Sequence, residues 1–308
     1  MRRTAGETGD TRPRAETEGA VPLAAGILGS RLDPGLHLVA TPIGTARDIT
    51  LRALDVLNAA DVLAAEDTRT LRHLMAIHGI PLRGRRILAW HDHSPERSTE
   101  LILAAIAEGG GVAYCSDAGT PLVADPGFAL ARAVSAAGGR VHAVPGASAL
   151  LAALTIAGQP TDRFLFAGFA PTAQTARRRW LAELAVIAAT VVIFESPRRV
   201  RELLDDLCEV DSSRDISVCR ELTKKFEEVL RGTVAEVRDL VPDDGLRGEV
   251  VVVLGPPARL AVDDDVVRDA LRSRLDRMTL RDASTQVAAL TGRSRKDVYA
   301  VALAIKEE

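Results

Sequence analysis

The feature that most constrains the fold is an alternation of short apolar runs with segments of helical period, which begins at Leu36. Apolar runs such as Val62–Ala65 and Val112–Cys115 have the length and composition of buried strands. The segments between the runs carry leucines on one helical face, as Leu51 and Leu54 do. Strands that alternate with helices in this way predict a mostly parallel sheet with helices on both faces.

The expected elements form two α/β series, which are separated at Pro145-Gly146 and show no internal repeat. The residues before them are rich in Gly, Arg, Thr, Glu and Pro and have no periodicity, which is typical of a flexible extension. Strands are expected at 36–40, 62–65, 87–90, 112–115 and 141–144, then at 164–167, 190–194, 216–219 and 250–254. The expected domains are an extension over 1–34, an N-terminal α/β domain over 35–147, a C-terminal α/β domain over 148–257 and a helical segment over 258–308.

The last part of the chain has no strand pattern. Between Val266 and Lys306, nine Arg or Lys and four Asp give a local charge of +5. Within this stretch, Ala283–Leu290, the turn Thr291-Gly292 and Ser294–Leu303 have the spacing of a helix-turn-helix. A helical cap on the α/β body explains the same pattern, so the sequence leaves both interpretations open.

Composition limits the possible partners and the compartment. With 39 basic and 42 acidic residues the net charge is −3, so a nucleic acid would have to bind to local basic patches. No apolar run is long enough to span a membrane. The three cysteines are widely spaced and predict free thiols, and neither they nor the histidines have zinc-site spacing. The N-terminus lacks the pattern of a signal or transit peptide, so we expect a cytoplasmic protein.

Ligands of open α/β sheets bind beyond the carboxyl ends of the strands, so the loops that follow strands are the candidates for a site. The most informative loop runs from Ser116 to Gly127 and contains two Asp, two Gly and two Pro. Its small residues allow a ligand to approach the backbone, and Asp117 is placed to accept hydrogen bonds from ribose hydroxyls or an amine. A long structured turn without a ligand is the alternative.

Two other strand-end loops carry polar side chains. Glu66-Asp67-Thr68-Arg69 brings two carboxylates and an arginine to a helix start, where Asp67 and Thr68 are also suited to cap the helix. His91-Asp92-His93 brings two histidines to another strand end. Histidines at this spacing are weak evidence for a metal, so we expect polar substrate contacts or a proton acceptor there, with ordinary surface histidines as the alternative.

Standard nucleotide motifs are missing, while basic clusters follow two strands of the second series. No GxGxxG follows a strand and no GK[ST] loop occurs, which argues against a dinucleotide-dependent dehydrogenase and a P-loop NTPase. Arg198-Arg199 and Arg220 to Lys225 lie at strand ends, where basic side chains can neutralise the phosphates of a nucleic acid. Ordinary surface charge is the alternative for each cluster.

Taken together, these motifs resemble the tetrapyrrole-methylase-fold S-adenosylmethionine methyltransferases, and within them the family of ribosomal RNA small subunit methyltransferase I. The matching segments run in order from Leu36 to Leu254, and the C-terminal helices resemble a helix-turn-helix addition of this family. The one departure within the motifs is Thr45-Ala46, where the family often has Asn-Leu or Asn-Ala. The segments are LVATPIGTARDITLRALDVL, DVLAAEDTRTLRHLMAIHGI, SDAGTPLVADPG, VPGASALLAAL, DRFLFAGFAP, FESPRR, CRELTKKFEEVLRGT and GEVVVVLG.

The resemblance implies a tetrapyrrole-methylase fold of two α/β domains with a cofactor cleft between them, a small helix-turn-helix-like segment, and a homodimer. It implies 2′-O-methylation of a decoding-centre cytidine in 16S ribosomal RNA, with S-adenosylmethionine as cofactor and no metal. The substrate would be the RNA within the small ribosomal subunit. By the same resemblance, the cofactor contacts are expected at Pro42, Asp117, Ala118, Gly119, Leu122, Val123, Ser148, Phe194 and Gly248.

Methyl transfer to a hydroxyl requires alignment of the reacting atoms and a group that accepts the proton. Among the polar residues after strands, Glu66, Asp67 and Lys224 are the first candidates for that catalytic role. Three alternatives remain open: a small-molecule tetrapyrrole methylase, a metal-dependent hydrolase, and a non-catalytic nucleic-acid-binding protein built around Arg272–Leu303. The residues expected to contact the RNA substrate are Arg69, His91, His93, Arg198, Arg199, Arg220 and Lys225.

Overall fold

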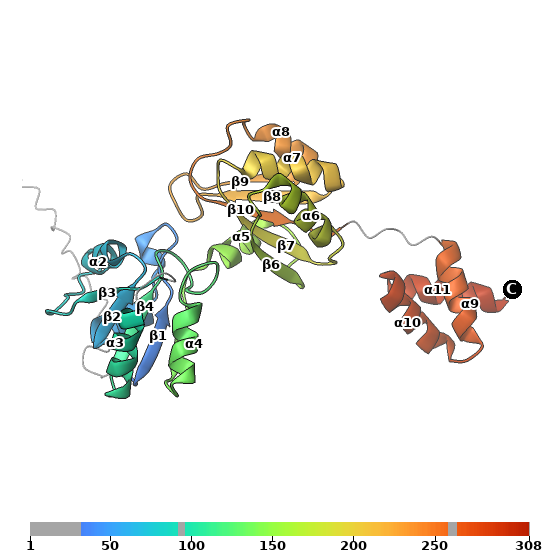
Figure 1. Cartoon of the computed structure of the whole chain (residues 1–308). Helices are drawn as coiled ribbons and strands as arrows, with labels where there is room; N and C mark the ends of the chain where they lie inside the picture. The colour runs from blue at the N-terminus through green and yellow to red at the C-terminus, as the bar shows by residue number, and fades with distance from the viewer. Residues whose placement is uncertain (1–31, 92–95, 258–263, 308) are drawn as a thin grey trace, which may run out of the picture. The chain divides into compact units, whose positions relative to one another are not determined.

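The computed structural model describes residues 32–91, 96–257 and 264–307, so most of the expected extension lies outside the described residues (Figure 1). The chain divides into two compact units. The first unit comprises the residues up to Ala152 together with Glu221–Glu227, and the second comprises Ala153–Arg220 and the residues from Glu228 onward. The expected boundary at residue 147 lies shortly before this division.

The first unit contains an all-parallel sheet of five strands in the order β3-β2-β4-β1-β5. The expected parallel sheet is confirmed here, and each strand lies within one residue of its predicted bounds. Strands β1 and β4 are neighbours although the chain between them makes two other strands. The bounds are β1 Gly35–Val39, β2 Val62–Ala65, β3 Ile87–Ala89, β4 Gly111–Cys115 and β5 Val141–Val144.

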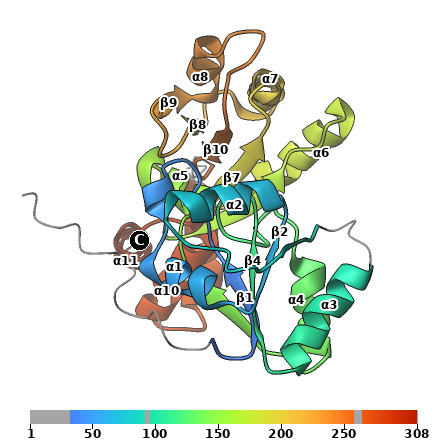
Figure 2. The same cartoon turned by 90° about the vertical axis from the view of Figure 1, so that its left-hand side faces the viewer.

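Helices cover both faces of this sheet (Figure 2). Side chains alternate between the faces of a strand, so in β4 Ala113 and Cys115 pack toward one pair of helices and Val112 and Tyr114 toward the other. The first pair is α1 Leu51–Ala59 and α2 Thr68–Ile77, and the second pair is α3 Glu96–Ala107 and α4 Phe128–Ala136. A short 3-10 turn, η1, occupies Ala46–Asp48.

The structure decides between the two possible caps of α2 and shows where α4 begins. Helix α2 is capped by Asp67, whose carboxylate accepts a hydrogen bond from the Arg69 N–H, and Thr68 is already the first helical residue. Helix α4 begins at Phe128 after Gly127, whose φ of 121° is left-handed backbone that favours glycine. Asp125 and Pro126 therefore belong to the loop after β4.

The second unit contains a sheet in the order β6-β7-β10-β8-β9, in which only β6 and β7 are parallel. The mostly parallel arrangement is thus limited to the first unit. Strand β9 and helix α8 were not predicted from sequence. Strand β9 was missed because its segment EVLRGT is half-exposed at a sheet edge and lacks an apolar run. The bounds are β6 Phe164–Phe169, β7 Thr190–Glu195, β8 Asp215–Arg220, β9 Glu228–Thr233 and β10 Val250–Leu254.

One face of the second sheet packs against three helices, and an ion-pair network joins two of them. Arg177 is buried between α6 and α7 and pairs with the buried carboxylate of Asp206 at 2.7 Å, and Arg178 binds the second oxygen of that carboxylate at 2.7 Å. Two members of the basic run Arg177–Arg179 therefore hold helices together. The three helices on this face are α6 Gln174–Ala185, α7 Val200–Asp211 and α8 Val234–Leu240. The remaining helix before them in the chain is α5 Ala149–Ala157.

The C-terminal residues form three helices with their own apolar core. The predicted helix-turn-helix is confirmed as α10 Leu280–Thr291 and α11 Arg295–Glu307, and Gly292 ends α10 with a φ of 66°. Helix α9, Asp264–Leu275, completes the bundle. Among the described residues no helix is both long enough and apolar enough to cross a bilayer. The core consists of Val267, Leu271, Ala283, Val287, Val298 and Ala302.

Candidate functional site

The first sheet has its topological switch point between β1 and β4, because the chain leaves these neighbours toward opposite edges of the sheet. The loops that follow the two strands are bound to each other. Thr41 and Gly119 exchange backbone hydrogen bonds of 2.9 and 3.0 Å, and the Thr41 hydroxyl donates to the carbonyl of Ser116. The carboxyl ends of β1 and β4 therefore present one connected surface.

The loop after β4 has a strained backbone. Leu122 and Ala124 adopt left-handed conformations with φ values of 73° and 59°, which non-glycine residues rarely do. A Cβ on Gly127 would lie 2.9 Å from the Tyr114 ring, so the end of the loop requires glycine. Strained conformations of this kind cluster at functional sites, where the surrounding structure enforces them.

Glu66 and Asp117 lie in loops that are linked by two hydrogen bonds. The Asp67 N–H donates to Asp117 Oδ1 at 3.1 Å, and the Asp117 N–H donates to Glu66 Oε2 at 3.4 Å. Strands β2 and β4 are neighbours, so their strand-end carboxylates meet at the switch point. The structure thus joins a predicted catalytic candidate and a predicted cofactor contact.

Asp67 differs from Glu66 in its partner. The Arg69 guanidinium donates to both carboxylate oxygens, with Nη2 2.6 Å from Oδ2. These hydrogen bonds lower the pKa of Asp67 to about 2. A carboxylate with such a low pKa is a weak proton acceptor at neutral pH, so the structure favours a capping and Arg69-orienting role for Asp67.

Asp125 was not among the expected catalytic, cofactor or RNA contacts, although it lies in the loop after β4. Its carboxyl is half-buried in the loop after β4. Burial raises the pKa of Asp125 to about 6, and the negative charges of Glu66 and Asp117 contribute to the rise. Nothing in the local sequence distinguishes such a carboxyl from a helix cap, because its burial and the charge of Glu66, which comes from the loop after β2, depend on the folded chain.

Most of the other expected cofactor contacts belong to the first unit. Pro42 and Leu122 are half-buried, and Ala118 is exposed between Asp117 and the buried Gly119. Val123 donates its N–H to the carbonyl of Thr120. Ser148 precedes α5, and its carbonyl accepts the Ala152 N–H.

The second unit contributes Phe194 and Gly248 at one edge of its sheet. Glu195 and Arg220 are both in register with Val250, so the ends of β7 and β8 and the start of β10 share that edge. The Phe194 ring packs against Phe166 and Phe169 with centroid distances of 4.8 and 5.7 Å. Gly248 is exposed, with a φ of 90°.

The expected RNA-contacting arginines at this edge differ in how they are held. The Arg199 guanidinium binds the buried carboxylate of Glu195 and the carbonyl of Ala170. Arg220 pairs with Glu228 across the β8–β9 ladder at 3.0 Å. Arg198 is exposed. The structure therefore gives Arg199 and Arg220 intramolecular partners and leaves the surface of Arg198 open to solvent.

The remaining predicted residues lie elsewhere. Lys224 and the exposed Lys225 belong to the segment that groups with the first unit, and Lys224 Nζ lies 2.9 Å from Glu221 Oε1. His91 is exposed at the end of β3, and His93 lies outside the described residues. In the part of the chain that the structure describes, no three His, Cys, Asp or Glu side chains are grouped to hold a metal ion.

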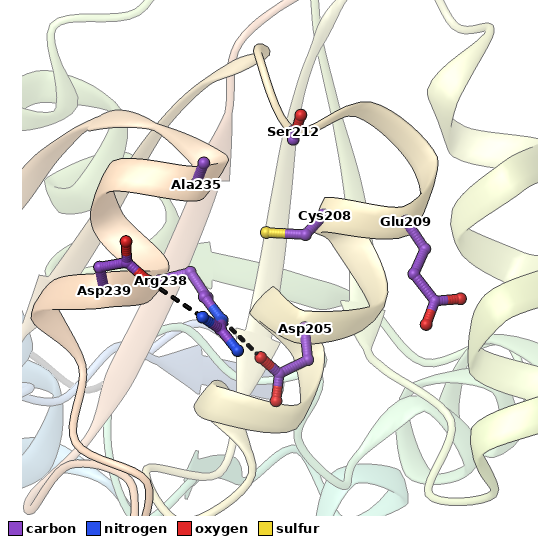
Figure 3. Close-up of a pocket in the computed structure, with 7 residues that line it drawn as sticks. All are labelled: Asp205, Cys208, Glu209, Ser212, Ala235, Arg238 and Asp239. Atoms are coloured by element: carbon purple, nitrogen blue, oxygen red, sulfur yellow. Dashed lines mark hydrogen bonds and ion pairs between the residues drawn. The ribbon is translucent and has the colours of Figure 1, made fainter.

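A separate pocket of about 410 Å³ lies between α7 and α8 (Figure 3). Arg238 crosses it and pairs with Asp205 at 2.7 Å and with Asp239 at 3.0 Å. Burial raises the pKa of the Cys208 thiol, which makes it less reactive. None of the predicted site residues lines this pocket.

Comparison with solved structures identifies the fold. The chain is similar to uroporphyrin-III-C-methyltransferase from Thermus thermophilus, with a TM-score of 0.51 and 22% identity over 72% of this chain and 94% of that one. It is also similar to the methyltransferase CobJ, with a TM-score of 0.56 and 20% identity over 74% of this chain and 97% of that one. The model of the tetrapyrrole (corrin/porphyrin) methylases matches residues 35–238.

Curated relatives narrow the assignment. Ribosomal RNA small subunit methyltransferase I of Mesorhizobium japonicum is 42% identical over 90% of this chain and 94% of its own length. The protein of the same name from Escherichia coli O157:H7 is 38% identical over 87% of this chain and 94% of its own. The model of the RsmI C-terminal HTH domain matches residues 261–306.

The chain therefore belongs to the tetrapyrrole methylases and, among them, to the family of ribosomal RNA small subunit methyltransferase I. This confirms the resemblance drawn from the sequence motifs and the expected fold with its helix-turn-helix addition.

Proposed function

We propose that this protein transfers the methyl group of S-adenosylmethionine to the 2′-hydroxyl of a cytidine ribose in the decoding centre of 16S ribosomal RNA. Membership of the family named for small-subunit methylation carries the proposal. The connected loops at the switch point of the first sheet support it, because they offer small residues beside carboxylates.

The residues at the switch point fit S-adenosylmethionine. Ala118 and Gly146 are exposed and present backbone without a bulky side chain. Glu66 and Asp117 are hydrogen-bond acceptors, and the amine and ribose hydroxyls of the cofactor are donors. We propose that Asp117, with the loop around it, holds the cofactor, together with Pro42, Gly119, Leu122, Val123, Ser148, Phe194 and Gly248.

The cofactor supplies a methyl group that its sulfonium already activates, so the protein has to orient the hydroxyl and accept its proton. Glu66, Asp67 and Lys224 are the candidates for this catalytic role. The low pKa of Asp67 argues against it as the acceptor. Lys224 pairs with Glu221, which suits it to carry positive charge beside a nucleotide. These observations favour Glu66 as the proton acceptor.

We propose that the RNA is bound through local basic groups. Exposed Arg69, Arg198 and Lys225 are suited to contact phosphates, and His91 is exposed at a strand end. On α11, Lys296, Tyr299, Leu303 and Lys306 follow one another at helical spacing on the exposed face. An exposed tyrosine between lysines allows base stacking and phosphate contact on one surface.

The proposed setting is the cytoplasm, with the RNA in an assembled or assembling small subunit and the protein acting as a homodimer. Incubation with labelled S-adenosylmethionine and unmethylated small subunits, followed by nuclease digestion and mass spectrometry, tests the reaction. A 2′-O-methylcytidine in the decoding centre is expected. Cofactor binding without label on subunits or free 16S RNA would contradict the proposal and favour a small-molecule tetrapyrrole methylase.

A further inference from the structure

The segment Glu221–Glu227 lies between β8 and β9 in sequence, yet it groups with the first unit. Leu222 is buried within it, and Thr223 and Lys224 are half-buried. Glu221 and Thr223 have left-handed backbone, with φ values of 53° and 62°. This conformation is exceptional for a β-branched residue such as threonine, so contacts around the segment must enforce it.

Gly44, in the loop after β1, provides the closest of these contacts. A Cβ placed on Gly44 would lie 2.6 Å from Lys224 Cγ, 2.6 Å from Thr223 Oγ1 and 2.8 Å from the carbonyl oxygen of Leu222. Real side chains do not approach so closely, so only glycine at position 44 allows the segment to lie where it does. Gly44 is not among the residues with positive φ, so its own backbone accepts alanine.

Polar contacts fix the segment on this glycine. The Thr45 N–H donates to Thr223 Oγ1 at 3.1 Å, and the Thr223 N–H donates to Glu227 Oε2 at 2.6 Å. The Thr223 side chain thus connects two parts of the chain that are 178 positions apart. Lys224, the next residue, is held beside the loop that carries the proposed cofactor contact Pro42.

We infer that Gly44 and Thr223 are positioning residues that hold Lys224 at the site for contact with the ribose or phosphate of the RNA nucleotide that is methylated. The inference rests on the proposed function, because it assigns the segment a part in methyl transfer to RNA. Gly44 acts by leaving room for the segment, and the Thr223 hydroxyl acts by accepting the Thr45 N–H.

Steady-state methylation of small subunits tests this role. Gly44→Ala and Thr223→Val are each expected to lower kcat by about tenfold. Thr223→Ser keeps the hydroxyl and is expected to restore the wild-type rate, and Thr175→Val on the exposed surface of α6 is the matched control. Cofactor affinity should stay within about threefold of wild type, because the segment does not carry the proposed cofactor contacts. An unchanged kcat in Gly44→Ala would overturn the inference.

A double-mutant cycle asks whether Gly44 acts through Lys224. In the Lys224→Met background, Gly44→Ala is expected to lower kcat by less than about twofold, because the positioned group is already gone. Independent, multiplicative losses would mean that Gly44 serves the cofactor loop itself, and this result would also overturn the inference.

Limited proteolysis gives a readout that needs no activity. Trypsin should cleave after Lys224 or Lys225 about tenfold faster in Gly44→Ala than in the wild type, because the displaced segment opens locally. An unchanged cleavage rate would refute the role of Gly44 in seating the segment. If the wild type fails to methylate subunits, the proposed function fails, and the cleavage rates still decide whether Gly44 seats the segment.

Discussion

The strand ends of the two sheets differ in how their charges are balanced. At the switch point of the first sheet, burial raises the pKa of Asp125, and the negative charges of Glu66 and Asp117 raise it further. At the strand ends of the second sheet, Glu195 pairs with Arg199, and Arg220 pairs with Glu228. Paired charges stabilise the fold they belong to, whereas like charges held together are better explained by a ligand that they bind.

The largest loss of unfolding free energy is expected from breaking the ion-pair network of Arg177, Arg178 and Asp206 in the second unit. Asp206→Ala leaves Arg177 buried without its main partner, and such a change costs about 3–5 kcal/mol of unfolding free energy. Urea unfolding followed by circular dichroism measures the loss. Glu209→Ala removes an exposed partner of Arg178 and is the control, with an expected cost below about 1 kcal/mol. Equal effects of the two changes would show that burial does not set the cost of breaking an ion pair in the second unit.

Replacing Asp125 in the first unit is expected to change the unfolding free energy in the opposite direction. Its folded pKa of about 6 lies above the ordinary value of 3.8, so the folded state binds more protons between these values and loses stability as the pH rises through them. Asp125→Asn is therefore expected to stabilise the protein by about 1–2 kcal/mol at pH 7.5 and by almost nothing near pH 4.

Thermal melts at the two pH values measure this difference. Asp48→Asn, at an exposed position of η1, is the control for loss of one negative charge. Destabilisation by Asp125→Asn at pH 7.5 would show that the hydrogen bond between Ser116 and the Asp125 carboxylate outweighs burial and the neighbouring negative charges, and the contrast between the two regions would then be wrong.

A smaller effect is expected on cofactor binding. Asp117→Ala removes a carboxylate from the switch point and is expected to weaken the binding of S-adenosylmethionine about tenfold, or by about 1.4 kcal/mol. Asp117→Asn removes the negative charge but keeps an acceptor for the Asp67 N–H, so it distinguishes the effect of the charge from the effect of the hydrogen bond. Titration calorimetry measures both affinities, and unchanged binding in Asp117→Ala would remove Asp117 from the cofactor site.

The smallest effect is expected on the affinity for the small subunit when the C-terminal helices are removed. Deletion of residues 262–308 removes nine Arg or Lys and nine Asp or Glu, so the deleted segment is neutral as a whole. Its basic groups are concentrated between Val266 and Lys306, where the local charge is +5, and we expect loss of these groups to lower subunit affinity about three- to tenfold. Cofactor affinity should not change, because the helices have their own core. Filter binding at two salt concentrations measures the loss. Equal affinity and equal salt dependence after deletion would make the segment a structural cap.

Periodicity was sufficient to predict the first sheet, because a strand buried on both faces, such as β4, is a continuous apolar run. The same pattern did not reveal β9, whose charged and half-exposed residues lie at an edge. A signal for α8 was present, since Thr233 and Glu236 form a capping box.

The candidate site was only partly accessible from sequence. The position of Glu66 and Asp117 after strands was enough to place both at one edge of a parallel sheet. The raised pKa of Asp125 depends on burial and on the charge of Glu66 from another loop, and the contact of Gly44 with Thr223 joins distant parts of the chain. Such through-space relations leave no local pattern.

The placement of Glu221–Glu227 with the first unit has a consequence for synthesis of the chain. A nascent chain that has emerged as far as Ala152 already contains every strand of the first sheet. It still lacks the segment that lies on Gly44. If Lys224 has the role that we infer, the site is completed only after β8 has been made, so the appearance of a competent enzyme on the ribosome follows, rather than accompanies, the folding of its first sheet.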